Sequence, residues 1–518
     1  MKRLFSRRIP AGGASSDSPG RRSRGQVMVI GALAIVVLLV CAGLAVDVGM
    51  LWTQYHQMKN ATDAAAKAAA EEILSGNAET ASTGSCTQNA PQCAGINDAS
   101  INGFTAGGVN NVSVTINTPP LSGPNAGDSQ YAEAIISQSV PSYFLRALSL
   151  LGVANTNTVP MTTRATAKIQ TGNACIWTQD PTTAQRHSLT IGENNNDANL
   201  MGPNCTVFIN SGSVDPLSTH NGGCTYMKSI TIVGDYINDS DCVQVAPYPQ
   251  PVTGAPPVND PLAYMQEPTV GGCDFGTSTT AEVITTSTTL SPGTYCGGIQ
   301  IYGGSSVVVT FSAGTYILNG GGLIAKNSSS TTVPGPGGVA PEGGPAGQCG
   351  SDTCNTTPTC SSTVGPTLIG TGVTFYNTGS MTTSSSSTPA SSTPASSTSS
   401  TSSGTSTTTT PSLAFSGFNV QAASGSSLTP PTSGALEGML FMEDRNSPTS
   451  TTNLVACGSY TGTFYFPNAE LSFGGTGSPA FNNFLAYDLL IGTTYTIGTD
   501  YSSLLDGSPF KIGTALSE

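Results

Sequence analysis

One stretch of the sequence restricts the fold more than any other feature: residues 27–46 run from Val27 to Val46 without a charged side chain. An α-helix of about 20 residues rises about 30 Å, which is the thickness of the hydrocarbon core of a bilayer. Gly31, Leu38 and Gly43 lie within this run. The stretch therefore predicts a single transmembrane helix close to the N-terminus.

The charges around this span predict its orientation. Residues 1–24 contain seven of the 17 basic residues of the chain and one acidic residue, and Asp47 directly follows the span. Excess Lys and Arg is retained in the cytoplasm. Residues 1–24 are therefore expected to form a basic cytoplasmic tail, with the body of the chain on the other side of the membrane.

Two other structures compete for this stretch. A buried core helix would also be apolar, and a cleaved signal peptide would also follow basic residues. However, the run is longer than the apolar core of a usual signal peptide, and no Ala-x-Ala pattern follows it. We therefore expect the helix to be retained.

The helical pattern continues beyond Asp47. Leu51, Tyr55 and Met58 fall on one helix face, an Ala-rich stretch follows, and Ser75-Gly76 is a typical helix end. Residues 25–75 are thus expected to form one helix. Its apolar stripe could pack on the following domain or on a neighbouring protein, and the sequence leaves both open.

This order of features resembles the N-terminal segment of TadG-like (TadE/TadG-like) proteins of the tight-adherence, or Flp, pilus-assembly system. The resemblance is carried by Arg24-Gly25, by Gly-Leu-Ala-Val-Asp-x-Gly from Gly43 to Gly49, and by Asn-Ala-x-Asp-Ala-Ala-Ala at residues 60–66. It covers about 50 of the 518 residues. The resemblance implies a bacterial inner-membrane protein whose helix docks with other pilus-assembly membrane proteins.

Two features of related proteins are missing from this sequence. Pilin-like relatives are cut after a Gly and carry a Glu five residues after that Gly. In this chain, the residue five positions after Gly25 is Ile30. Some long relatives carry a metal-binding Asp-x-Ser-x-Ser motif, which the residues after Asp506 do not complete. Prepilin-type processing and a metal site of that kind are therefore not expected.

Residues 76–172 predict a small α+β domain. Residues 77–110 are small and polar and predict a loop, while alternating residues 112–117, 131–137 and 159–169 predict strands. Pro141 is expected to begin a short helix between the last two strands. This order of elements is typical of a compact α+β unit beside the membrane.

Residues 173–518 have a different texture, with short alternating strands between Gly-rich turns at roughly 20-residue spacing. Gly293-Thr294-Tyr295 recurs as Gly314-Thr315-Tyr316, 21 residues later, and residues 309–311 are echoed by residues 373–375. Periods of this size favour a β-solenoid, here a parallel β-helix. A β-sandwich is the alternative. The fold class is therefore one transmembrane helix, a small α+β domain and a large all-β region.

Two insertions interrupt the all-β region. Residues 327–366 are rich in Gly, Pro, Ser and Thr, and residues 379–412 are nearly all Ser and Thr. Such sequences bury too little apolar surface to offset the entropy of ordering the backbone, so disorder is expected. Strands are expected again at residues 435–442 and 462–473, with Pro467 at a corner or an edge.

The 13 cysteines predict disulfides. Cys41 lies in the span and is expected to be an inert apolar residue. The others are even in number and lie beyond the span, where an oxidising compartment would pair them. Spacing does not fix the pairs, although Cys86 with Cys93 is the most local choice, and a zinc site is not expected. The disulfide candidates are Cys86, Cys93, Cys175, Cys205, Cys224, Cys242, Cys273, Cys296, Cys349, Cys354, Cys360 and Cys457.

Catalytic candidates are few. The only histidines are His56, His187 and His220, and no nucleophile elbow, phosphate loop or His-Glu-x-x-His motif is present. Asp235, Asp239 and Asp241 could bind calcium or lie in a solvated turn. We expect no cofactor. Because the chain beyond the basic tail is strongly acidic, nucleic-acid binding is not expected either.

The sequence thus predicts a non-enzymatic, membrane-anchored component of tight-adherence pilus assembly or surface adhesion. Its partners would be other pilus-assembly membrane proteins, with a polysaccharide, host or abiotic surface as a further partner of the body. Two alternatives remain open: a membrane-tethered β-helix enzyme acting on carbohydrate, and an adhesin unrelated to pili.

Overall fold

The computed structural model describes most of the chain. The described residues are 24–77, 86, 89–144, 158–172, 174–181, 183, 187–192, 198–219, 223–237, 242–245, 250–277, 280–327, 365–379, 417–447, 450–475 and 477–517. They form two compact units. The first comprises Met1–Ala69, Gln92–Ala167 and Leu516–Glu518, and the second comprises Ala70–Pro91 and Lys168–Ala515.

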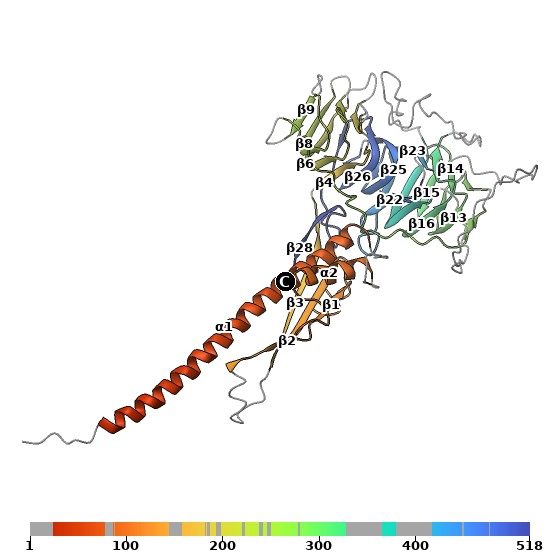
Figure 1. The fold of residues 1–518 in the computed structure, drawn as a ribbon. Helices are drawn as coiled ribbons and strands as arrows, with labels where there is room; N and C mark the ends of the chain where they lie inside the picture. Colours follow the sequence, from red (N-terminus) through yellow and green to blue (C-terminus); the bar gives the residue numbers. More distant parts are fainter. Residues whose placement is uncertain are drawn as a thin grey trace, which may run out of the picture. The chain divides into compact units, whose positions relative to one another are not determined.

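The predicted long helix is present as α1, Arg24–Leu74 (Figure 1). It is the one helix among the described residues that is long and apolar enough to cross a membrane. Only 6% of its most apolar 18-residue window is buried. The helix ends where the sequence predicts, because Gly76 has a φ of +72° and takes up the left-handed backbone that ends helices.

The strands of the first unit are β1 (Ser113–Asn117), β2 (Tyr131–Pro141) and most of β3 (Thr158–Thr171). β1 and β2 are antiparallel, and the sheet order is β1-β2-β3-β28, with β28 at Lys511–Leu516. The prediction at Pro141 is wrong, because Pro141 is the last residue of β2. The short helix expected after it falls mostly outside the described residues.

The loop predicted at residues 77–110 is also wrong, because it contains helix α2, Ala90–Ile101. Small side chains explain this helix. Ala90, Cys93 and Ala99 are buried, and a Cβ at Gly95 would lie 3.0 Å from the Ala65 carbonyl of α1. Close packing, rather than intrinsic propensity, therefore stabilises α2.

The second half of α1 packs on strands of its own chain. A stripe of buried residues occurs every three or four positions, as expected for one helix face. Thr62 Oγ1 lies 2.6 Å from Thr163 Oγ1 of β3, and Lys59 Nζ donates to the Arg164 carbonyl at 3.1 Å. Of the predicted stripe, Met58 is buried whereas Tyr55 is 39% exposed. The buried stripe consists of Met58, Ala61, Thr62, Ala65, Ala66 and Ala69.

The second unit is built from parallel strands in successive layers. Within a 19-stranded sheet, a strand pairs with the equivalent strand of the next layer, for example β13 with β16, as well as with the strand that precedes or follows it in the sheet order. The first run contains β10 (Phe275–Gly276), β13 (Gly293–Cys296), β16 (Gly314–Asn319), β19 (Val373–Asn377), β22 (Met439–Glu443), β25 (Gly462–Gly475), β26 (Asn482–Ile491), β4 (Ala174–Thr178), β6 (Leu200–Ile209) and β8 (Cys224–Ile232).

Two further runs lie beside the first. The second contains β11 (Glu282–Ile284), β14 (Ile299–Tyr302), β17 (Leu323–Lys326), β20 (Phe418–Ala422), β23 (Ser450–Ala456), then the C-terminal parts of β25 and β26, β5 (Leu189–Ile191) and β7 (Leu217–Thr219). A separate five-stranded sheet contains β12 (Thr288–Leu290), β15 (Val308–Phe311), β18 (Thr367–Thr371), β21 (Ser427–Thr429) and β24 (Ser459–Tyr460). β27 (Tyr495–Thr496) and β9 (Cys242–Val245) pair with β6 and β8, respectively.

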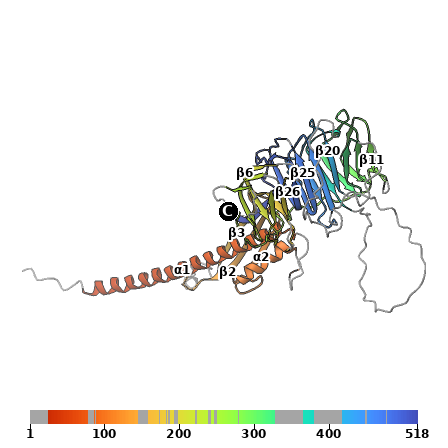
Figure 2. The same ribbon diagram turned by 90° about the horizontal axis from the view of Figure 1, so that it is seen from above.

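The chain enters this array of strands in the middle. β26 pairs in parallel with β4, so that Phe484 lies opposite Ile176. From β4 the chain proceeds to β9 at one end, resumes with β10 at the other end, and returns through β25 to β26 (Figure 2). The sequence therefore runs through the array in two blocks that meet at the β26–β4 pair.

A continuous ladder of aromatic rings fills the interior. Phe275 stacks on Tyr295 at 4.5 Å between ring centroids, and the contacts continue at 4.9–5.9 Å as far as Phe484. Such pairs each contribute about 0.5–1.5 kcal/mol beyond the burial of their area. Parallel pairing places these rings opposite one another in successive layers, except that Tyr295 and Tyr316 are offset by two residues. Its members are Phe275, Tyr295, Tyr316, Phe375, Phe441, Phe464 and Phe484.

The observed register differs in detail from the sequence echoes. β13 and β16 are neighbours, as the repeat indicates, but Gly293 pairs with Tyr316 rather than with Gly314. The second repeat does not mark equivalent strands, because residues 309–311 and 373–375 belong to different sheets. Both echoes reflect a shared turn-and-aromatic pattern, whereas backbone pairing sets the layer. Pro467, which was predicted at a corner or an edge, lies between Phe466 and Glu470, where the β25–β26 register shifts.

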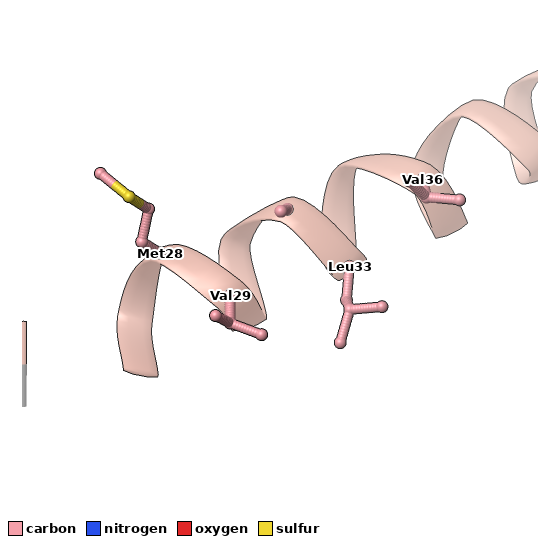
Figure 3. Close-up of a pocket in the computed structure, with 5 residues that line it drawn as sticks. Met28, Val29, Leu33 and Val36 are labelled. Atoms are coloured by element: carbon pink, nitrogen blue, oxygen red, sulfur yellow. The ribbon is translucent and has the colours of Figure 1, made fainter. Parts of the chain in front are cut away.

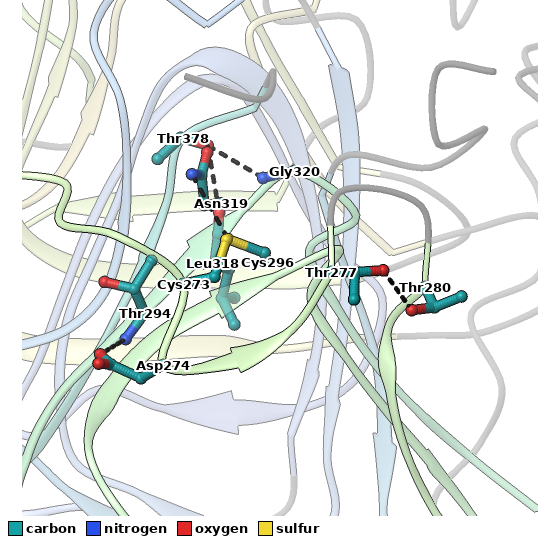
Figure 4. The surroundings of a disulfide bond; sticks show 10 residues. All are labelled: Cys273, Asp274, Thr277, Thr280, Thr294, Cys296, Leu318, Asn319, Gly320 and Thr378. Carbon is teal, nitrogen blue, oxygen red and sulfur yellow. Dashed lines mark hydrogen bonds between the residues drawn. A yellow bond between two sulfur atoms is a disulfide. The ribbon is translucent and has the colours of Figure 1, made fainter. Parts of the chain in front are cut away.

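Disulfides link both terminal strands of the 19-stranded sheet to their neighbours. Cys242, the first residue of β9, is bonded to Cys224 of β8. At the other end, Cys273 precedes β10 and is bonded to Cys296 of β13. The Asn319 side chain donates a hydrogen bond to the Cys296 sulfur (Figure 4). Exposed strand edges can pair with other chains, and these two edges are short and cross-linked.

A third disulfide, between Cys175 and Cys205, joins β4 to β6 near the point where the chain enters the array. Cys86, Cys93 and Cys457 are also disulfide-bonded, and Cys41 is free and exposed. The candidates Cys349, Cys354 and Cys360 lie outside the described residues, as do most of the two predicted insertions and residues 1–23.

Candidate functional site

The most distinctive polar group near the apolar span of α1 is the carboxylate of Asp47. It follows the apolar run on α1, yet its side chain is only 2% exposed. Its Oδ1 accepts a hydrogen bond from the Tyr143 N–H at 3.1 Å, and its Oδ2 accepts one from the Phe144 N–H at 2.8 Å. Asp47 therefore holds the chain that follows β2 against the helix.

Gly43 completes this contact one helical turn earlier. A Cβ at Gly43 would lie 2.6 Å from Cδ1 of the Phe144 ring, too close for any side chain. The absence of a side chain at Gly43 lets the ring lie directly on the helix backbone. Gly43 and Asp47 are four residues apart and so share one face of α1, and together they form a seat for Phe144.

The span itself is open to its surroundings. Met28, Val29, Leu33 and Val36 project from the helix (Figure 3) and are 57–80% exposed. Exposed apolar side chains of this number are stable only in lipid or against another protein. A Cβ at Gly31 or Gly49 would meet nothing within 4 Å, so these two small residues, unlike Gly43, leave room for close packing with another helix.

Residues 25–72 match the Tad family model, "Putative Flp pilus-assembly TadE/G-like". This segment is TadE/G-like. No curated protein and no solved structure shows a significant match. The TadE/G-like segment coincides with α1 from just after its start to just before its end.

The structure gives physical roles to the pattern that carries this resemblance. Gly43 and Asp47 of the TadE/G-like segment seat Phe144, and residues 60–66 include Ala61, Thr62 and Ala65 of the buried stripe. One part of the segment therefore holds the chain after β2, and the other packs on the sheet. The residues between Met28 and Val40 remain on the surface.

The candidate catalytic residues do not gather in one place among the described residues. His187 Nε2 lies 3.2 Å from Asp215 Oδ2, whereas His56 is an exposed residue of α1 beside Trp52. Asp235 is in an exposed turn and accepts a hydrogen bond from the Tyr236 N–H at 2.9 Å. His220, Asp239 and Asp241 lie outside the described residues. Where side chains are described, no group of three or more potential metal ligands is present.

Sequence reasoning missed a charged network in the second unit. Tyr465 donates to Asp260 Oδ2 at 2.6 Å and accepts from Arg445 Nε at 2.8 Å. Arg445 Nη2 also donates to the carbonyls of Leu262 and Met265, each at 2.8 Å. Burial raises the pKa of the Asp260 carboxyl, although the Tyr465 hydrogen bond opposes this. The network fixes residues 260–265 to β25, so its charges have a structural role.

A second buried acid, Glu133, stabilises the first unit. Its carboxylate accepts hydrogen bonds from Arg164 Nε at 2.6 Å, Ser122 Oγ at 2.6 Å and Asn117 Nδ2 at 2.7 Å. Burial alone would raise the pKa of Glu133, but hydrogen bonds from Ser122, Asn117 and Arg164 outweigh it and lower the pKa to about 2. Glu133 is therefore ionised at neutral pH and ties β2 to β3 and to the turn after β1.

Proposed function

We propose that the chain is a membrane-anchored, non-enzymatic component of Flp pilus assembly whose body lies outside the cytoplasm. The observation that carries this proposal is the TadE/G-like match of residues 25–72 on a helix whose span is exposed. Arg21, Arg22 and Arg24 precede the span, which supports an N-terminus in the cytoplasm. Other membrane proteins of the pilus system are the proposed partners of the span.

The parallel strands of the second unit support a β-helix as the architecture of the body. Its layers repeat, its interior holds an aromatic ladder, and its terminal strands carry disulfides. A layered module of this kind suits a scaffold or an adhesive surface outside the cytoplasm. Its disulfides suit an oxidising compartment.

A carbohydrate-active enzyme on the same anchor is the second candidate, because parallel β-helices carry such activities in other proteins. That argument is an analogy between folds and identifies no active site here. The charged network of Arg445, Asp260 and Tyr465 is hydrogen-bonded to the backbone of its own chain. An adhesin unrelated to pili is the third candidate.

Topology and pilus formation together test the proposal. Protease added to spheroplasts should digest the chain beyond α1 and spare a small N-terminal fragment, and deletion of the chain should abolish Flp pili. A protected body would contradict the orientation. Normal pili in the deletion strain, together with polysaccharide cleavage by the purified protein, would establish the enzyme instead.

A further inference from the structure

Three aromatic residues near the C-terminal end of the apolar span are exposed, although a helical anchor does not require them. Tyr143 is 61% exposed, Phe144 is 46% exposed, and Trp52 of α1 is 64% exposed. Trp and Tyr concentrate at the interface between hydrocarbon and headgroups, where an apolar ring and a polar edge are both satisfied. The ring of Phe144 has no polar edge and suits the hydrocarbon side of that interface. Exposed rings at this level of the helix therefore fit a bilayer interface.

The Phe144 seat fixes the depth of two of these rings. Asp47, which binds both backbone N–H groups, is the first residue after the apolar run, and Gly43, which contacts the Phe144 ring, lies four residues earlier. At 1.5 Å per residue, that ring reaches about 6 Å along the helix axis from Asp47 into the span. Tyr143 lies beside Asp47, at the boundary.

We propose that Tyr143 and Phe144 form a second contact with the membrane, inserting into the headgroup region of the bilayer that α1 crosses. The occupant of this surface is lipid, because the exposed Phe144 ring lies on Gly43, within the apolar run that the bilayer would surround. The inference rests on α1 being a membrane anchor. A contact between the bilayer and the chain after β2 would restrain the tilt and rotation of α1 in the membrane.

Tryptophan fluorescence in the full-length protein tests the contact. We would place Phe144→Trp in a Trp52→Phe background and reconstitute the protein into phosphatidylcholine vesicles with bromine on the acyl chains near the headgroups. Bromine quenches nearby indole rings, and the buried Trp177 supplies a constant background. The expected result is a marked loss of emission relative to vesicles without bromine, with a shift of the emission to shorter wavelength.

Two matched variants give the comparison. Leu121→Trp reports an exposed position whose backbone N–H donates to the Glu133 carboxylate. Glu133 lies eight residues before Pro141 in β2, so this position is about 26 Å from the end of the strand that leads to Phe144. Val36→Trp reports the middle of the span. Strong quenching of Val36→Trp by bromine near the bilayer centre, with Phe144→Trp quenched no more than Leu121→Trp, would overturn the inference and leave the anchor intact. Absence of quenching at Val36 would overturn the anchor itself.

Removing Asp47 gives an independent check of the mechanism. In the Phe144→Trp protein, Asp47→Ala should reduce quenching by bromine near the headgroups, because the ring loses its fixed position. If bromine near the headgroups quenched neither form, the ring would not lie in the headgroup region, and the lipid contact would be wrong.

Discussion

The carboxylate of Asp47 and the backbone N–H of Phe144 are joined by a 2.8 Å hydrogen bond that links the long apolar helix α1 to the chain after β2. The Phe144 ring lies on Gly43 of the same helix. Through this contact, two positions of the TadE/G-like pattern have a role within the chain itself. The apolar surface from Met28 to Val40 remains available to lipid and to partners.

Asp47→Ala should loosen the segment around Phe144. The substitution removes two hydrogen bonds to a charged acceptor, and such bonds contribute about 1.5–3 kcal/mol each. We expect chymotrypsin to cleave after Tyr143 or Phe144 faster in the variant reconstituted in nanodiscs. Val48→Ala, an exposed neighbour on the same helix, should leave the cleavage rate unchanged. Equal rates for both variants would show that Asp47 does not hold the segment.

Gly43→Leu should displace Phe144, whereas Gly31→Leu should not. A Cβ at Gly43 overlaps the Phe144 ring, but one at Gly31 meets nothing within 4 Å. The measurement is the same chymotrypsin cleavage rate, and both variants keep an apolar span. If Gly31→Leu alone impairs pilus formation, then Gly31 acts in packing with partners, and Gly43 acts only within the chain.

Acid should weaken the first unit through Glu133. Its pKa in the folded chain is about 2 against an ordinary value of 4.5, so its ionised form stabilises the fold above about pH 4.5, and this contribution is lost as the pH falls towards 2. Glu133→Gln should lower the free energy of unfolding at pH 7 by roughly 2 kcal/mol and flatten the acid-dependent loss. Chemical denaturation at several pH values measures both effects. Identical acid profiles for wild type and variant would contradict this role.

Removing the Cys224–Cys242 disulfide should free the terminal strand β9. The bond closes a short loop, with a sequence separation of 18, and such a crosslink contributes about 2–4 kcal/mol. The double substitution Cys224→Ala with Cys242→Ala should speed hydrogen exchange in β8 and β9 while leaving β13 and β16 protected. Cys41→Ala, which removes a free thiol, is the control. Uniform loss of protection would mean that the whole array unfolds as one unit.

Local patterns predicted much of this fold. The uncharged run, the Ala-rich continuation and Ser75-Gly76 predicted α1 to within a residue or two of its ends, because helix length, propensity and capping are properties of neighbouring residues. Strands were likewise predicted near β22 and β25. The helix α2 was missed, because its stability comes from close packing of Gly95 on α1 rather than from its own sequence.

The remaining features depend on contacts between distant residues. Nothing in the local sequence places Ile176 of β4 opposite Phe484 of β26, so the entry of the chain in the middle of the array could not be predicted. The seat of Phe144 was missed for the same reason, although a single acid directly after an apolar span was a usable signal. Arg445 and Asp260 are likewise far apart in the sequence, so their network could not be predicted from neighbouring residues.

Photocrosslinking from the exposed span tests the central claim most directly. A photoreactive amino acid at Leu38, which is 67% exposed, is activated in cells that produce Flp pili, and the crosslinked proteins are identified by mass spectrometry. The same probe at the buried Ala65 is the control. We expect crosslinks from Leu38, and not from Ala65, to other membrane proteins of the pilus system. Crosslinks from Leu38 to lipid alone, with normal pili in cells lacking the chain, would contradict it.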